Sequence, residues 1–452
     1  MLEKASLKIL HETVERLDQG FPALPALNPV PADLEKIEEV LSLTAERLRD
    51  NYPYFHPLYA GQMLKPPHPV ARLAYALAQW INPNNHALDG GRASSAMERE
   101  AVAEIAQMFG WTEHLGHLTG GGTMANLEAL WVAGQISPGK TIVASEQAHY
   151  THQRISGVLK LPYASIPCDA CGRMHVDALR KRLAKGDVGT IVATMGTTAT
   201  GSVDPLADIL KLKQKFGFRV HADAAYGGYF TLTENLEPHT RQAFDQITQA
   251  DSIVIDPHKH GLQPYGCGCI LFRDQDVGRL YKHDSPYTYF SSKELHLGEI
   301  SLECSRPGAA AVALWATQRL LPLVRDGDFA KGLELGRKAA LDFHLRLSAD
   351  SRFVTAFVPE LDIVIFAPRS DSVTQSSIIS RRIFDAAAAK NLHLAVAELP
   401  IAFFETHLRA MKRDRATITC LRSVLMKPEH LEWMPRIWSI LQDATNQVLQ
   451  SS

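Results

Sequence analysis

Cysteine is scarce in this chain, which has six among 452 residues. So few cysteines do not make the disulfide framework of a small secreted domain. Cys168 and Cys171 form a single CxxC, and Cys267 and Cys269 lie too close together to complete a standard zinc knuckle. A lone CxxC is a weak signal for a metal or redox site. We therefore expect structural cysteines and a reducing, cytoplasmic location.

Long apolar runs and an excess of basic charge are missing as well. No apolar stretch reaches the length that crosses a bilayer, and the formal net charge is -2. We therefore expect neither a membrane nor a nucleic-acid partner. The N-terminal segment carries acidic residues throughout and lacks the apolar core of a signal peptide. Its leucines and valine recur at helical spacing, which predicts an amphipathic helix.

Three regions differ in pattern along the chain. Residues 1–65 are helical and then rich in proline and aromatic side chains, so they hold little core of their own. In residues 66–325, short β-branched runs alternate with helical stretches, which indicates an α/β fold with a mostly parallel sheet covered on both faces. Residues 326–452 mix helical and strand-like segments and are expected to form a smaller α+β domain.

Local signals predict where several elements begin. Ser95 with Glu98 fits a capping box, and Asp204 before Pro205 fits an N-cap followed by a proline at the first helical position. Five β-branched runs are expected to be strands, the last of which follows its predecessor through a loop and could be antiparallel. These runs are residues 141–144, 190–194, 219–222, 252–255 and 269–272.

Four clusters follow strands, where ligands of open parallel sheets bind. The first is the glycine-rich turn 119–123, whose following helix can cradle a phosphate, although a plain loop fits as well. No Lys-Ser or Lys-Thr follows it, so it is not a Walker loop. The second contains His149, which can stack on an aromatic ring or cap a helix.

The third and fourth clusters carry a carboxylate and an amine. Asp223 ends a strand among small residues, where it can pair with a pyridine nitrogen or cap the next turn. Lys259 lies between two histidines, and partial burial near cations lowers the pKa of an amine, as a Schiff-base lysine requires. A surface lysine is the plain alternative.

The order of glycine-rich turn, histidine, aspartate and lysine, with the segments HADAAYGG (residues 221–228) and DPHKHG (residues 256–261), resembles the fold-type-I enzymes that use pyridoxal 5′-phosphate (PLP). It resembles in particular the group II amino-acid decarboxylases, from about residue 51 to about residue 422. The resemblance implies a mostly parallel seven-stranded sheet flanked by helices, a small C-terminal domain, an N-terminal helical arm and a homodimer with shared active sites.

The resemblance also implies roles for single residues. Lys259 would form the Schiff base with PLP, and Asp223 would pair with the pyridine nitrogen. His149 and Ala225 would pack on the two faces of the ring. The residues near the phosphate or the 3′ oxygen would be Gly122, Thr123, Thr197, His258 and Ser305, and Ser305 would reach the phosphate of the neighbouring subunit.

The expected reaction is the decarboxylation of an L-amino acid to an amine and CO2. Tyr287, Tyr289 or His149 would return a proton to the α-carbon, and the sequence does not choose among them. The candidate substrate-contacting residues are His56, Tyr59, His86 and Arg422.

Several alternatives to an aromatic amino-acid decarboxylase stay open. Aromatic side chains near the expected entrance slightly favour an aromatic substrate, while polar ones there could recognise glutamate or aspartate. A carbon–carbon lyase, a transaminase, an aldehyde-forming oxidative decarboxylase and a non-catalytic protein on the same fold are the other possibilities.

Overall fold

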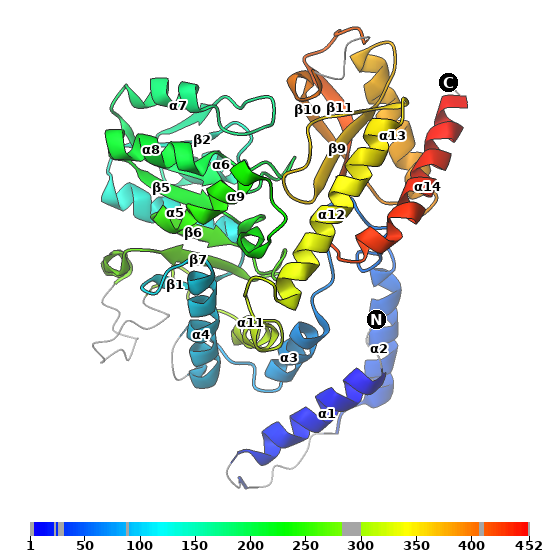
Figure 1. Cartoon of the computed structure of the whole chain (residues 1–452). Coiled ribbons are helices and arrows are strands. Elements are labelled where there is room, and N and C mark those ends of the chain that lie inside the picture. Colours follow the sequence, from blue (N-terminus) through cyan, green and yellow to red (C-terminus); the bar gives the residue numbers. More distant parts are fainter. Residues whose placement is uncertain are drawn as a thin grey trace.

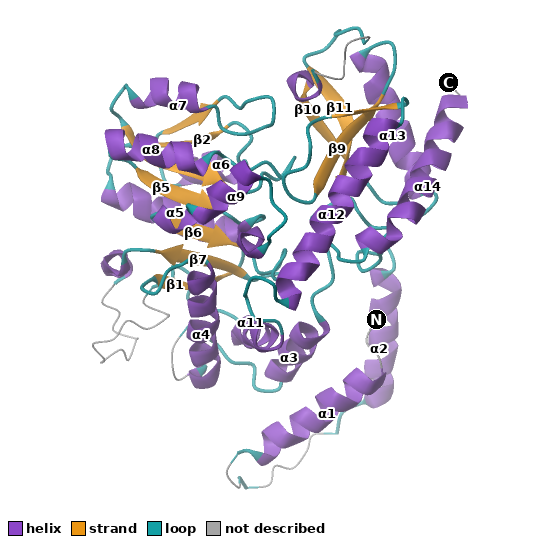
Figure 2. Ribbon diagram, in the orientation of Figure 1, coloured by secondary structure: helices purple, strands orange, loops and turns teal. Residues whose placement is uncertain are grey.

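The computed structural model describes residues 4–21, 24–25, 31–86, 90–282, 300–405 and 411–450. Two β-sheets lie side by side, each with helices packed against it (Figure 2). No helix in these ranges is both long and apolar enough to cross a membrane.

The larger sheet has seven strands in the order β1-β7-β6-β5-β4-β2-β3. Strands β6, β5, β4, β2 and β3 run parallel, and β7 joins β6 and β1 in antiparallel pairs. This confirms the expected seven-stranded, mostly parallel sheet and the antiparallel run at residues 269–272. The bounds are β1 Leu115–Thr119, β2 Thr141–Ser145, β3 Tyr163–Ile166, β4 Val188–Thr194, β5 Arg219–Asp223, β6 Ser252–Ile255 and β7 Gly268–Phe272.

Both faces of this sheet are buried, because successive side chains of a strand point to opposite faces. Ile191 of β4 joins the core beneath α7 and α8, whereas Val192 joins the core beneath α5 and α6. The helices that cover and flank the sheet are α4 Arg92–Met108, α5 Gly122–Ile136, α6 Thr151–Val158, α7 Val176–Leu183, α8 Leu206–Phe216, α9 Pro238–Asp245, α10 Gly278–Tyr281 and α11 Gly308–Leu320.

The C-terminal part of the chain forms an antiparallel sheet in the order β10-β11-β9-β8. Its strands are β8 Phe353–Thr355, β9 Ile363–Pro368, β10 Ala395–Pro400 and β11 Thr417–Val424. Its helices are α12 Asp328–Ala349, α13 Val373–Ala388 and α14 His430–Gln450. They share one apolar core with this sheet.

The N-terminal helices α1 Lys4–Gln19 and α2 Leu34–Leu48 lie at the periphery of the molecule, away from the two sheets (Figure 1). Neither helix has a buried residue. The third helix, α3 Pro69–Gln79, packs against α11. The sequence correctly predicts a helix at the N-terminal end. This helix, α1, contacts α3, which leaves Leu10, Val14 and Leu17 half-buried and Leu7 exposed.

Two predicted helix starts are wrong. Helix α4 begins at Arg92, so Ser95 lies inside it, and the carboxylate of Glu98 pairs with Arg306 Nη1 at 2.7 Å instead of returning to an N-cap. Helix α8 begins at Leu206 with Pro205 as its N-cap. The carboxylate of Asp204 instead accepts hydrogen bonds from the backbone N–H groups of two other segments, at 2.7 and 2.8 Å.

Candidate active site

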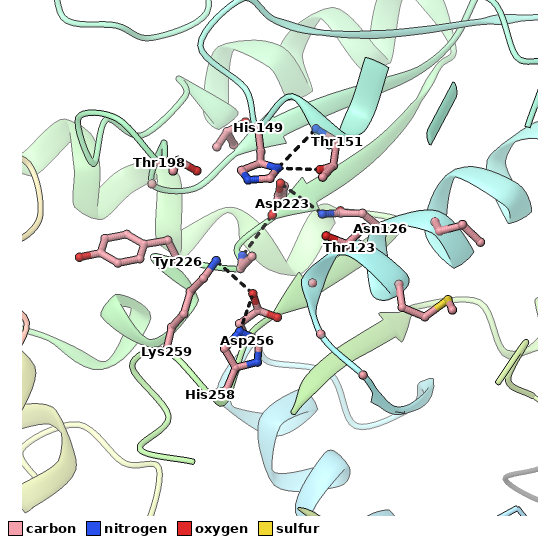
Figure 3. A pocket seen from close by; sticks show the side chains of 18 residues that line it. Thr123, Asn126, His149, Thr151, Thr198, Asp223, Tyr226, Asp256, His258 and Lys259 are labelled. Carbon is pink, nitrogen blue, oxygen red and sulfur yellow. Dashed lines mark hydrogen bonds and ion pairs between the residues drawn. The ribbon is translucent and has the colours of Figure 1, made fainter. Parts of the chain in front are cut away.

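A cavity of about 540 Å³ opens where strands β4, β5 and β6 end and helix α5 begins (Figure 3). This is the edge at which open parallel sheets bind ligands. The described residues that line it are Gly120–Gly122, Thr123, Met124, Asn126, Leu127, His149, Thr151, Thr194, Gly196, Thr198, Asp223, Ala225, Tyr226, Asp256, His258 and Lys259.

The glycine-rich turn joins β1 to the N-terminus of α5 at one side of the cavity. Gly121, the N-cap of α5, has φ +146, a conformation that L side chains rarely adopt. No side chain caps this helix, so its first backbone N–H groups stay available to a ligand. Free N–H groups and the helix dipole together favour an anion such as phosphate.

Asp223 is the last residue of β5 and is 4% exposed. Its Oδ2 lies 2.7 Å from His152 Nε2 and accepts a hydrogen bond from Asn126 Nδ2 at 3.4 Å, while its Oδ1 accepts one from the N–H of Ala225 at 3.2 Å. Burial alone would raise the pKa of Asp223, but the hydrogen bond and charge of His152 outweigh it and hold that pKa below its usual range. The site therefore carries a fixed negative charge.

Lys259 follows β6, and its Nζ lies 3.0 Å from Asp256 Oδ2. The side chain of Lys259 is 20% exposed, so the amine is partly shielded but reachable from the cavity. His258 beside it donates through Nδ1 to the carbonyl of Cys267 at 2.8 Å. Burial lowers the pKa of His258, which keeps its ring neutral near pH 7.

His149 lies after β2 and faces the same space as Asp223 and Lys259 (Figure 3). Its Nδ1 accepts from the N–H of Thr151 at 3.4 Å and lies 2.8 Å from the hydroxyl of that residue. Burial lowers the pKa of His149. A neutral, flat ring with its proton on Nε2 is the form that these contacts favour.

The structure brings together most of the residues that were predicted to hold a cofactor. Lys259, His149, Asp223, Ala225, Gly122, Thr123 and His258 all line this one cavity. Thr197 is fully buried, with its hydroxyl 2.7 Å from that of Thr200, and its two neighbours line the cavity. Ser305 accepts a hydrogen bond from Asn84 Nδ2 at 3.2 Å and is not among the lining residues.

The predicted substrate residues lie elsewhere in this single chain. None of His56, Tyr59, His86 and Arg422 is among the described lining residues. The His56 ring packs edge-on against Trp433 at 4.8 Å, and Tyr59 is buried. His86 donates its backbone N–H to Asn84 at 3.0 Å.

Arg422 on β11 is buried, and backbone carbonyls surround its guanidinium. It donates to the carbonyls of Thr198, Ala199 and Gly61 at 2.7, 3.0 and 3.1 Å. These bonds tie the turn after β4 to the C-terminal sheet, and a role in binding a carboxylate stays a prediction. Tyr287 and Tyr289 lie outside the described residues.

Sequence reasoning missed several polar residues of the cavity, among them Asn126 and Asp256. Asn126 follows Gly122 by four residues on α5 and therefore lies on the same helix face, a spacing that could have identified it. Asp256 opens the segment that contains Lys259, and its position three residues before the amine was the available signal.

Comparison with known proteins gives one family match. The pyridoxal-dependent decarboxylase conserved domain matches residues 128–368, more than half of the chain. The chain belongs to the pyridoxal-dependent decarboxylase family. This membership confirms the expected family and its cofactor.

Named relatives of the family align with part of the chain. An L-tyrosine decarboxylase of Enterococcus faecium is 29% identical over 386 residues, covering 63% of this chain and 63% of that protein. The chain thus spans less than two thirds of that relative's length. A probable L-tyrosine/L-aspartate decarboxylase of Methanothrix thermoacetophila is 31% identical over 279 residues, covering 61% of this chain and 69% of that protein.

Solved structures share the fold along nearly the whole chain. The Oryza sativa TDC with PLP and tryptamine has a TM-score of 0.77 at 17% identity and covers 99% of both chains. The apo form of mouse CSAD has a TM-score of 0.77 at 18% identity and covers 98% of this chain and 92% of that one. These structures confirm the expected fold class.

The cavity has the groups that PLP needs. The uncapped N-terminus of α5 suits the phosphate, the ionised Asp223 suits a protonated pyridine nitrogen, and the amine of Lys259 suits the aldehyde carbon. A side chain at Gly122 would fill this cradle, since a Cβ there would lie 2.7 Å from Asp256 Oδ2. The described residues therefore fit this cofactor.

Proposed function

We propose that this chain is a PLP-dependent decarboxylase that converts an L-amino acid into an amine and CO2. The observation that carries the proposal is one cavity with Lys259, an ionised Asp223 and an uncapped helix N-terminus, in a chain of the pyridoxal-dependent decarboxylase family. When bound, PLP withdraws electrons from the α-carbon of the substrate.

Each residue of the cavity then has a task. Lys259 would hold the cofactor through its amine. The N–H groups at Gly122 and Thr123 would hold the phosphate, and His258 lines the cavity beside them. His149 offers a neutral, flat ring against one face of the cofactor, and Ala225 offers a small side chain for the other face.

The proton that returns to the α-carbon needs a donor at the cavity. We keep Tyr287, Tyr289 and His149 as the candidates. His149 is supported by its place in the cavity and by a ring proton on Nε2, because Nδ1 accepts from Thr151. The two tyrosines belong to segment 284–293, which would have to reach the cavity and exclude water.

The relatives favour an aromatic substrate, since two of them are named L-tyrosine decarboxylases. Other relatives are named L-tyrosine/L-aspartate decarboxylases, so an acidic substrate is the second candidate. The test is to incubate the PLP-loaded protein with each proteinogenic amino acid and to measure CO2, amine, aldehyde and keto acid separately.

Equal amounts of CO2 and amine from tyrosine, phenylalanine or tryptophan would support the proposal. Amine from aspartate or glutamate alone would favour the second candidate. Aldehyde with consumption of O2 would indicate an oxidative decarboxylase, and keto acid without CO2 a transaminase. Absence of PLP binding would contradict the whole assignment.

We also propose that the active form is a homodimer in which residues 1–65 contact the partner subunit. The exposed apolar side chains on α2, among them Leu34, Ile37 and Leu41, support this assembly, because such side chains usually find cover. A stable, active monomer in light-scattering chromatography would contradict it.

The free state of all six cysteines supports the cytoplasmic location that we propose.

A further inference from the structure

His152 is a buried side chain that the proposed reaction leaves without a task. It lies in α6, three residues after His149, and does not line the cavity. Its Nε2 is 2.7 Å from Asp223 Oδ2, and the ring is 0% exposed. His152 therefore contacts a carboxylate that lines the cavity, so its effect on Asp223 reaches the site.

The two carboxylate oxygens of Asp223 have different hydrogen-bond partners. Oδ2 is occupied by His152 Nε2 and by the more distant Asn126 Nδ2. Oδ1 accepts only the N–H of Ala225, at 3.2 Å, within the described part of the chain. Since a carboxylate oxygen accepts more than one hydrogen bond, Oδ1 keeps capacity for a donor in the cavity.

The proton of His152 must lie on Nε2. A carboxylate oxygen only accepts, so Nε2 is the donor to Asp223. His152 Nδ1 is buried and has no hydrogen-bond partner among the described residues. The side chain therefore makes one specific polar contact, and that contact is with Asp223.

The other buried histidine of the network adds no charge. His221 Nε2 lies 2.8 Å from Asn126 Oδ1, and its Nδ1 lies 2.9 Å from Ser252 Oγ. Burial lowers the pKa of His221 to about 3, so it is neutral and serves to orient the amide of Asn126. The strong donor to Asp223 is therefore His152.

We propose that His152 is a positioning residue that keeps Asp223 ionised and aims its Oδ1 at the pyridine nitrogen of PLP, an inference that rests on the proposed function. Without the short bond to His152, burial favours the neutral carboxyl. With PLP bound, a proton between Asp223 and the pyridine nitrogen would then lie on Asp223, and the cofactor would withdraw electrons less strongly.

The test compares two similar substitutions. In His152→Gln the amide nitrogen ends near the position of Nε2 and can still donate to Asp223. In His152→Asn the side chain is too short to reach it. The readouts are the ¹⁵N resonance of PLP labelled at the pyridine nitrogen and the dissociation constant of PLP from the apoprotein.

Wild type and His152→Gln are expected to show a protonated pyridine nitrogen. His152→Asn is expected to shift the resonance towards the unprotonated value, to weaken PLP binding by roughly 10- to 100-fold and to lower kcat more than it changes KM. His430→Asn, at an equally buried histidine in α14, controls for the loss of a buried ring. His152→Phe replaces the asparagine variant if that variant does not fold.

A protonated resonance and wild-type PLP affinity in folded His152→Asn or His152→Phe would overturn the inference. The same spectral shift in His430→Asn would overturn it too, because the effect would then not be specific to Asp223. Failure of the wild-type protein to bind PLP would instead refute the proposed function.

Discussion

Replacing Gly268 by alanine is expected to displace the glycine-rich turn at residues 119–123, although Gly268 does not line the cavity. Gly268 begins β7, and a Cβ there would lie 2.5 Å from the carbonyl carbon of Gly121 and 2.7 Å from its Cα. Because carbon atoms pack at about 3.5–4.0 Å, the turn has to retreat by roughly 1 Å. Gly268 is not a lining residue, so any effect on ligand binding acts through the turn.

The expected loss of PLP affinity follows from the hydrogen bonds that the displaced turn can no longer make. A hydrogen bond to a charged group contributes about 1.5–3 kcal/mol, so losing one N–H contact to the phosphate weakens PLP binding by roughly 10- to 100-fold. The assay is a spectroscopic titration of the apoprotein with PLP, with a thermal unfolding curve for each variant.

Gly157→Ala is the matched control for this substitution. Gly157 lies in α6, the helix that follows His149, and a Cβ there would meet nothing within 4 Å. Wild-type PLP affinity is therefore expected for Gly157→Ala. If folded Gly268→Ala also binds PLP as tightly as the wild type, the glycine-rich turn is not the phosphate site and the reasoning is refuted.

Three further substitutions test other parts of the account. Asp223→Asn removes the negative charge that faces the cavity and is expected to lower kcat by at least roughly 10- to 100-fold; unchanged CO2 release would contradict its pairing with the pyridine nitrogen. Tyr289→Phe should cut amine formation if Tyr289 donates the proton, and unchanged turnover would exclude it. Burial lowers the pKa of Lys427 to about 7, below that of the unfolded chain, so stability should rise with pH above 7 by about 1.4 kcal/mol per pH unit. Burial also lowers the pKa of Lys65, to about 8, so this second lysine adds its own rise above pH 8. In Lys427→Met the rise of the unfolding midpoint between pH 7 and 8 should therefore be smaller than in the wild type, and the same slope in both proteins would contradict it.

The sequence predicts the parts of the fold that have strong local patterns. The β-branched runs at 190–194 and 252–255 are strands, because both of their faces are buried. Strands β1 and β3 were not predicted. They are short, and β1 carries His117, a buried polar residue whose Nε2 lies 3.0 Å from Glu128 Oε2. Whether such a short segment forms a strand depends on its pairing with neighbouring strands, and local sequence does not encode that pairing.

The sequence likewise predicts some features of the candidate site and not others. Asp223 and Lys259 stand in distinctive segments, so the sequence identified them as members of one site. The sequence does not predict contacts between segments that are far apart in the chain. His152 meets Asp223 across 71 positions of the chain, and the guanidinium of Arg422 meets backbone carbonyls more than two hundred residues away. Such contacts depend on how the sheet and helices pack.

Lys259 is the residue that we propose binds PLP covalently. The direct measurement is to load the protein with PLP, reduce it with borohydride, digest it and locate the phosphopyridoxyl group by mass spectrometry. We predict that the label lies on the peptide that contains Lys259, and that Lys259→Ala loses both the label and the visible absorption of the bound cofactor. A label on another lysine of the wild-type protein, or visible absorption retained by Lys259→Ala, would contradict the account.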